Sequence, residues 1–206
     1  MDEIVNSKHL EAITNILRET GERIEGNLIC DIAPDNWIYN HTIDKIKNLQ
    51  YLCKGKKRII EIGVNGCHSL LIMLLINPSA EYLLFDLNNH RYTEPALNYI
   101  KTSFPNTTIN VVFGNSVTTV KKYCQENMHA EPFDMCHLDG GHTEDVFSHD
   151  YANVKDLVKN GTIIFDDYDY PEIRGFINKK LESGEISKYI DTNIIDTNLH
   201  FVYHYN

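Results

Sequence analysis

Two short apolar segments of this chain each end abruptly in aspartate, and this pattern constrains the fold more than any other. Residues Met135–Asp139 read Met-Cys-His-Leu-Asp, and residues Thr162–Asp166 read Thr-Ile-Ile-Phe-Asp. Short apolar runs bounded by glycine and asparagine are typical of buried strands in a parallel sheet. The carboxyl ends of such strands meet at one edge of the sheet, where α/β proteins bind ligands. We therefore expect an α/β fold with carboxylates gathered at its ligand-binding edge.

The rest of the chain supports this fold class. From about residue 55, strand-like and helix-like segments alternate, which is typical of a Rossmann-like, doubly wound sheet. Residues 1–54 are predicted to be an N-terminal helical extension that contributes to substrate binding or a dimer contact, with substrate specificity expected in segment 29–40. Residues 55–206 are predicted to form the main domain. The expected strands cover residues 58–64, 82–86, 109–113, 135–139, 162–166, 187–195 and 199–205.

Composition limits the possible partners. The chain has 206 residues and a formal net charge of −10 without a basic run, so a nucleic-acid partner is disfavoured and a small molecule is expected. Five scattered cysteines without a CxxC motif indicate free thiols in a reducing compartment. Neither a signal peptide nor an apolar stretch long enough for a bilayer is present, which predicts a cytoplasmic protein without membrane attachment.

A second set of residues indicates a nucleotide-like cofactor. The first predicted strand ends in Glu61-Ile62-Gly63-Val64-Asn65-Gly66, the second ends in Asp86, and the third leads into Gly114-Asn115-Ser116. Glycines let the backbone approach a ligand, an acid at the second strand end can bind both ribose hydroxyls, and polar groups after the third strand suit a purine edge. The glycine loop alone is equally compatible with a tight turn, and a nicotinamide-binding domain is a rival interpretation, although it would favour a complete G-x-G-x-x-G.

The aspartates at the fourth and fifth strand ends predict a cation site. If these strands are neighbours, their backbones lie about 5 Å apart, and Asp139, Asp166 and Asp167 converge with His142 close by. Such a concentration of negative charge is costly without a cation. The alternatives are that Asp139 caps the following helix and that Asp166 and Asp167 form a solvated loop. His137, inside a predicted strand, is expected to be a hydrogen-bonded core histidine.

These motifs resemble class I S-adenosylmethionine-dependent methyltransferases over residues 55–206. Glu61, Gly63 and Gly66 match the first motif of that family, Asp86 matches its ribose-binding acid, and Asn115 and Ser116 stand near its commoner Gly-Asp-Ser sequence. The resemblance implies bound S-adenosylmethionine and a mostly parallel seven-stranded sheet whose last strand is antiparallel.

Within that family, the acids and His142 are similar to the metal-dependent sugar O-methyltransferases of the macrolide and aminocoumarin glycoside type. This resemblance implies Mg²⁺ held by Asp139, Asp166 and Asp167. Coordination to such an ion lowers the pKa of a hydroxyl, and His142 is the expected general base. We therefore predict a Mg²⁺-dependent O-methyltransferase acting on a sugar or sugar-like hydroxyl. A metal-independent methyltransferase for another small acceptor and a catalytically silent binding scaffold are the alternatives, and a homo-oligomer is possible.

Overall fold

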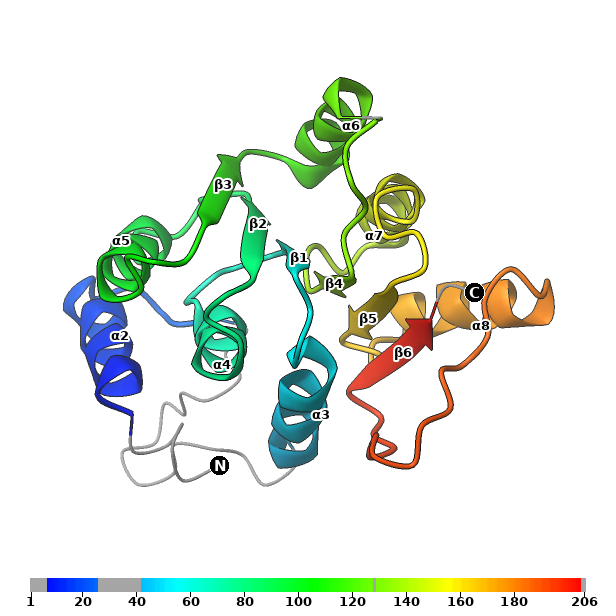
Figure 1. Cartoon of the computed structure of the whole chain (residues 1–206), viewed down its shortest axis with the longest axis horizontal. Coiled ribbons are helices and arrows are strands. Elements are labelled where there is room, and N and C mark those ends of the chain that lie inside the picture. The colour runs from blue at the N-terminus through cyan, green and yellow to red at the C-terminus, as the bar shows by residue number, and fades with distance from the viewer. Residues whose placement is uncertain (1–6, 26–41, 128, 205–206) are drawn as a thin grey trace.

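A six-stranded sheet forms the centre of the computed structural model, which describes residues 7–25, 42–127 and 129–204 (Figure 1). The strand order is β3-β2-β1-β4-β5-β6. The first five strands are mutually parallel, and β6 runs antiparallel to β5. The strands are β1 (Arg58–Ile62), β2 (Glu81–Asp86), β3 (Ile109–Phe113), β4 (Met135–Leu138), β5 (Thr162–Asp166) and β6 (His200–His204). The predicted Rossmann-like architecture is confirmed. The segment 29–40, expected to carry specificity, lies outside the described residues.

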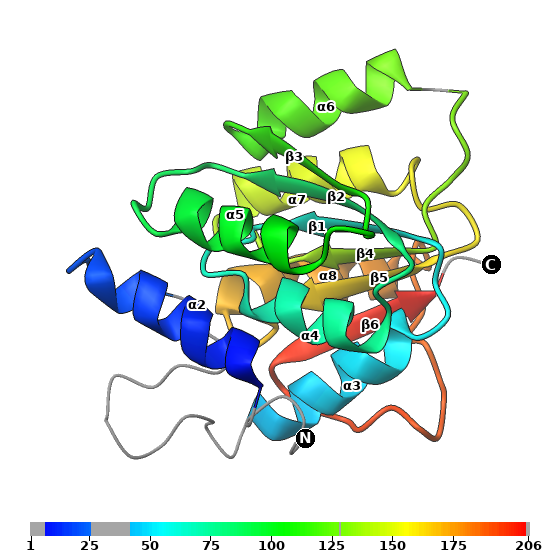
Figure 2. The same cartoon turned by 60° about the vertical axis from the view of Figure 1, so that its left-hand side comes forward.

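Helices cover both faces of this sheet (Figure 2). Every residue of β4 and β5 is buried, which is why these strands read as continuous apolar runs rather than as alternating ones. One face carries the helices α2 (Lys8–Glu19), α3 (Ile43–Cys53), α4 (His68–Ile76) and α5 (Thr93–Ser103). The other face carries α6 (Ser116–Glu126), α7 (Glu144–Val154) and α8 (Pro171–Glu182).

The helices of the predicted N-terminal extension share a hydrophobic core with the sheet. Leu10, Ile13 and Leu17 of α2 pack in the same buried cluster as Ile46 and Leu49 of α3. This cluster also contains the almost uniformly apolar helix α4, which is buried along its length. Helix α3 is therefore held firmly against the sheet, and it reaches the edge at which the strands end.

The prediction of a seventh strand over residues 187–195 is wrong. This segment makes a single antiparallel bridge, between Lys188 and Tyr203, and then turns. The Asp191 carboxylate accepts hydrogen bonds from the backbone N–H of Asn193 at 2.8 Å and from the Tyr51 hydroxyl at 2.8 Å. An aspartate that bonds the backbone two residues ahead favours a turn over a strand, and Ile190, 89% exposed, has no core to join.

The strand order reverses between β1 and β4, and this reversal positions the site. Strand β1 pairs with β2 on one side and with β4 on the other, so the helices that follow these strands leave on opposite faces. A crevice opens at such a switch point, at the carboxyl ends of the strands. The β4–β5 register pairs Leu138 with Phe165, which places the next residues, Asp139 and Asp166, side by side.

No helix within residues 7–25, 42–127 and 129–204 combines the length and apolar character that crossing a membrane would require.

Candidate active site

A pocket of about 870 Å³ lies at the carboxyl ends of the parallel strands. Its size is within the range of small-molecule and cofactor sites. Most of the residues singled out from the sequence line it, although they are far apart in the chain. These are Gly63, Asp86, Asn115, Ser116, Asp139, His142 and Asp167. Glu61, Gly66 and Asp166 do not line this pocket and lie beside or beneath it.

The glycine loop brings two strand ends unusually close together. Gly63 has a φ of +87°, and a Cβ atom built on it would lie 1.8 Å from the carbonyl oxygen of Asp139. No other residue type fits a backbone approach this close. Gly66 serves a different contact, because its Cβ position would lie 2.8 Å from the side chain of Leu17 on α2. The two glycines thus shape the pocket floor and seat the N-terminal helix.

Replacing Gly63 by alanine is expected to destabilise the protein, because the added Cβ atom would clash with the Asp139 backbone. The control is Gly55→Ala, because Gly55 also has a positive φ, +73°, but open space around its Cβ position. The control loses about 1–2 kcal/mol from the unfavourable backbone conformation. Gly63→Ala should lose at least about 2 kcal/mol more, measured by urea unfolding. Equal losses in the two variants would show that the approach of Gly63 to Asp139 is not tight.

Asp86 fastens the glycine loop to the second strand. Its Oδ2 atom accepts hydrogen bonds from the backbone N–H groups of Val64, at 2.8 Å, and Asn65, at 2.9 Å. Its Oδ1 atom accepts from the N–H of Asn88 at 2.7 Å. A carboxylate held by three backbone donors has a fixed orientation, and this one faces the pocket.

The third strand, which pairs with β2, leads into two polar side chains that line the pocket. Asn115 caps α6, with its side-chain oxygen accepting from the N–H of Val117 at 3.0 Å. Ser116 donates its hydroxyl to the buried carboxylate of Asp150 at 3.0 Å. Burial raises the pKa of Asp150 to about 6, against the opposing effect of the Ser116 hydrogen bond. Both side chains are therefore positioned by local bonds at the pocket wall.

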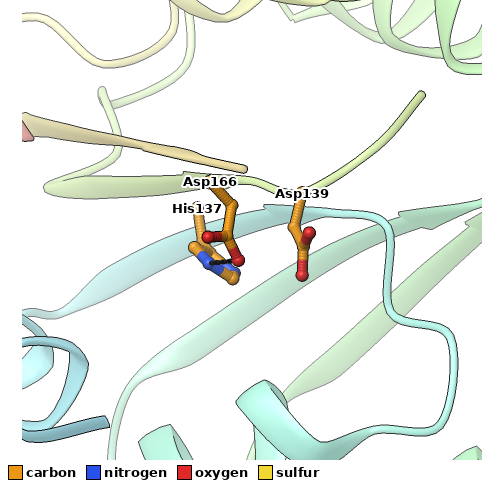
Figure 3. Close-up of side chains that lie close together, drawn as sticks. All are labelled: His137, Asp139 and Asp166. Carbon is orange, nitrogen blue, oxygen red and sulfur yellow. Dashed lines mark ion pairs between the residues drawn. The ribbon is translucent and has the colours of Figure 1, made fainter. Parts of the chain in front are cut away.

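A buried charged cluster lies at the ends of β4 and β5. His137, Asp139 and Asp166 offer ligand atoms that all lie within 4.8 Å of one another. Figure 3 shows the three side chains projecting to the same side of the strands. Both ring nitrogens of His137 are engaged, Nδ1 with Glu61 at 3.0 Å and Nε2 with Asp166 at 3.3 Å. Glu61, predicted as a cofactor residue, is fully buried on β1 and pairs with the histidine across the β1–β4 register.

The pKa values in this cluster shift in opposite directions. Burial alone would lower the pKa of His137, but its bonds to Asp166 and Glu61 raise it to about 10. Burial likewise disfavours charge on both acids. The pKa of Asp139 is raised by burial and by the nearby charge of Asp166, whereas the cations Lys45 and His137 hold the pKa of Asp166 well below its usual value. His137 is thus a hydrogen-bonded core histidine, as expected, and the pKa values of the two acids shift apart.

Lys45 is a pocket residue that the sequence analysis missed. Its Nζ atom lies 2.5 Å from Oδ2 of Asp166, and the two side chains are 12% and 1% exposed. Burial would lower the pKa of this lysine, but the charges of Asp166, Asp139 and Asp167 raise it above its ordinary value. Lys45 lies on an ordinary amphipathic helix, 121 positions before its partner, so no local motif marks it.

His142 and Asp167 form a separate pair at the pocket mouth. Nε2 of His142 lies 2.6 Å from Oδ2 of Asp167, and the imidazole stacks on Tyr170 with ring centres 4.5 Å apart. The hydrogen bond to Asp167 raises the pKa of His142. Asp167 has a φ of +55°, so the backbone turns directly after the strand and separates this acid from Asp166. The predicted metal acids therefore divide into three: Asp166 is buried, Asp139 is half-buried beside it, and Asp167 faces the histidine.

The two alternative roles of these acids do not match the structure. The cap of α7 is Thr143, whose hydroxyl accepts from the N–H of Val146, so Asp139 is free of that role. Asp166 is almost fully buried and does not belong to a solvated loop. The carboxylates of Asp139 and Asp166, with Asp167 at the rim, offer the hard oxygen donors that Mg²⁺ prefers. The donor set therefore fits a divalent cation, provided that Lys45 leaves Asp166.

Comparison with known proteins identifies the family and the fold of this chain. The family model described as "Methyltransferase domain" matches residues 60–168, more than half of the chain. No significant match was found among curated protein sequences. Solved structures share the fold at low sequence identity. An O-methyltransferase from Bacillus cereus in complex with SAH is 18% identical, with 96% of this chain and 90% of that chain covered at a TM-score of 0.65.

Two further structures are similar to the same extent. The O-methyltransferase TomG from Streptomyces achromogenes, involved in tomaymycin synthesis and solved with SAM, is 15% identical, with coverages of 98% and 91% and a TM-score of 0.65. CalS11, a TDP-rhamnose 3′-O-methyltransferase of calicheamicin biosynthesis, is 14% identical, with coverages of 97% and 95% and a TM-score of 0.64.

The fold and the pocket define a class I, S-adenosylmethionine-type methyltransferase architecture, as the motifs predicted. The chain belongs to the methyltransferase-domain family.

Proposed function

We propose that this protein is an S-adenosylmethionine-dependent O-methyltransferase that acts, with Mg²⁺, on a hydroxyl of a sugar or sugar-like small molecule. The observation that carries the proposal is the convergence, in one pocket, of the cofactor-type residues Gly63, Asp86 and Asn115 with the acid–histidine group around Asp139 and His142. A pocket with these two halves can hold a methyl donor beside an activated hydroxyl. The bound S-adenosylmethionine would supply an electrophilic methyl group on its sulfonium.

The cofactor half of the proposal depends on the strand ends β1 to β3. The Asp86 carboxylate, oriented by the glycine loop, would accept hydrogen bonds from a ribose diol. Asn115 and Ser116, after the neighbouring strand β3, supply further polar groups to the pocket. TomG and the Bacillus cereus O-methyltransferase share this fold and were solved with SAM and SAH.

Asp86→Ala is expected to weaken binding of S-adenosylhomocysteine at least tenfold, which corresponds to about 1.4 kcal/mol, because it removes a charge-assisted bond to the ribose. The matched control is Asp134→Ala. Asp134 also accepts two backbone N–H bonds with its Oδ2, from Lys57 at 2.6 Å and Arg58 at 2.9 Å, but it lies at the amino end of the sheet. Calorimetry should show normal affinity for the control. Equal weakening in both variants would mean that Asp86 acts through the fold alone.

The acceptor half depends on the carboxylates and His142. Asp139, Asp166 and Asp167 would hold the Mg²⁺, which when bound lowers the pKa of a coordinated hydroxyl and orients it. His142, held by Asp167 and stacked on Tyr170, exposes its ring to the pocket and can accept the proton from an acceptor hydroxyl. CalS11, which shares the fold, methylates a nucleotide sugar.

The direct test of the activity is a methyl-transfer assay that uses nucleotide sugars, with TDP-rhamnose as the first acceptor and a catechol as the comparison. Release of S-adenosylhomocysteine that requires a sugar acceptor and stops in excess EDTA is the expected result. Turnover that continues in EDTA would favour the metal-independent alternative. Turnover with the catechol alone would contradict the sugar acceptor and leave O-methylation standing.

A further inference from the structure

Besides His137, the carboxylate cluster at the ends of β4 and β5 already holds a second cationic side chain, which comes from helix α3. The ammonium of Lys45 lies 2.5 Å from Oδ2 of Asp166, and its charge also interacts with Asp139 and Asp167. These are the three acids proposed above as metal ligands. Lys45 comes from α3, outside the strand–helix repeat that builds the rest of the site.

Helix α3 is anchored so that Lys45 faces Asp166. Asn48, one helical turn further on, donates to the carbonyl of Ile195 at 2.7 Å and accepts from its N–H at 2.8 Å. The same amide lies 2.9 Å from Nε2 of His200, which is the residue directly opposite Asp166 in the β5–β6 register. Residues three positions apart share a helix face, so this anchor and the ion pair lie on the same side of α3. The ion pair is therefore built into the packing of the helix.

The Lys45 ammonium and a divalent cation cannot share this position. A divalent cation held by Asp166 would compete with the Lys45 ammonium for the carboxylate, whose Oδ2 the ammonium contacts at 2.5 Å. Two cations so close in a buried site repel each other strongly, because the low local dielectric screens them poorly. One of them must leave.

We propose that Lys45 and the divalent cation are alternative occupants of one site. The ammonium of Lys45 pairs with Asp166 while the metal is absent, and metal binding displaces the ammonium from that carboxylate. The inference relies on the proposed function only for the existence of the divalent cation. Sharing one site with Lys45 makes the affinity for the metal modest, because part of the binding free energy is used to break a buried ion pair.

The test is a calorimetric titration of Mn²⁺ into the wild-type protein, Lys45→Met and the control Lys47→Met. Lys47 lies on the same helix, is half exposed, and pairs with Asp44. Lys45→Met should bind Mn²⁺ at least tenfold more tightly than wild type, and Lys47→Met should match wild type. Equal affinity of wild type and Lys45→Met overturns the shared site and leaves the metal proposal intact. Absence of binding in all three proteins overturns both.

A second measurement uses the wild-type chain and avoids any folding defect of the variant. Reductive methylation of lysine amines, read residue by residue by mass spectrometry, should label Lys45 slowly without metal. Saturating Mn²⁺ should increase labelling of Lys45 several-fold and leave Lys47 unchanged. Unchanged protection of Lys45 under conditions in which calorimetry shows bound Mn²⁺ would overturn the displacement.

Discussion

Replacing His142 by alanine is expected to lower the maximal rate of methyl transfer by about a hundredfold or more. The ring is held between the Asp167 carboxylate at 2.6 Å and the stacked Tyr170, and it lines the pocket beside Asp139. Alanine removes the positioned base without emptying the core, because His142 is exposed on the pocket side. Affinity for S-adenosylhomocysteine should stay nearly unchanged, since the residues proposed to bind the cofactor lie at other strand ends.

The control for this variant is His149→Ala. His149 lies on α7 and does not line the pocket. Its Nδ1 atom lies 2.7 Å from the carbonyl oxygen of Asp145. Its loss should leave the rate unchanged.

Because Asp167 raises the pKa of His142, the neutral base persists only at higher pH, and the wild-type rate should fall as the pH drops through that raised value. If the His142→Ala variant kept the wild-type rate and pH profile, Asp167 rather than His142 would be the general base.

Asp166→Asn is expected to cost about 3–5 kcal/mol of unfolding free energy, which is the typical penalty for leaving buried charges without their partner. The substitution preserves size but removes the carboxylate that faces both Lys45 and His137. Urea unfolding should show a lower midpoint with an unchanged slope. The control Asp145→Asn, at an aspartate that is 82% exposed, should change the midpoint very little.

A double variant separates charge from packing. Adding Lys45→Met to Asp166→Asn removes one of the two stranded cations, and it should recover part of the lost stability. No recovery would show that the loss comes from local packing. A single variant Asp166→Asn that is as stable as wild type would contradict the buried ion-pair network altogether.

Much of this architecture was predictable because strand ends leave local marks in the sequence. The segments that end at Asp86, Asp139 and Asp166 are apolar runs stopped by a carboxylate, and parallel pairing then requires these ends to lie at one edge. The expected strand over residues 187–195 is the exception. The turn at Asp191 prevails because its carboxylate bonds the following backbone and Tyr51.

The parts of the site that could not be predicted from the sequence depend on contacts between distant segments. Lys45 meets Asp166 only because α3 packs against the core and is tied to β6 through Asn48, and no spacing in the chain encodes that. The pairing of Glu61 with His137 likewise depends on the β1–β4 register. Separation of Asp167 from Asp166 requires the positive φ at Asp167, which a sequence of two adjacent acids does not reveal.

Calorimetric titration with S-adenosylhomocysteine tests the central claim most directly, because it needs neither the acceptor nor the metal. The account predicts binding with one ligand per chain, weakened at least tenfold by Asp86→Ala and unaffected by Asp134→Ala. Binding of NAD(H) with none of S-adenosylhomocysteine would contradict it.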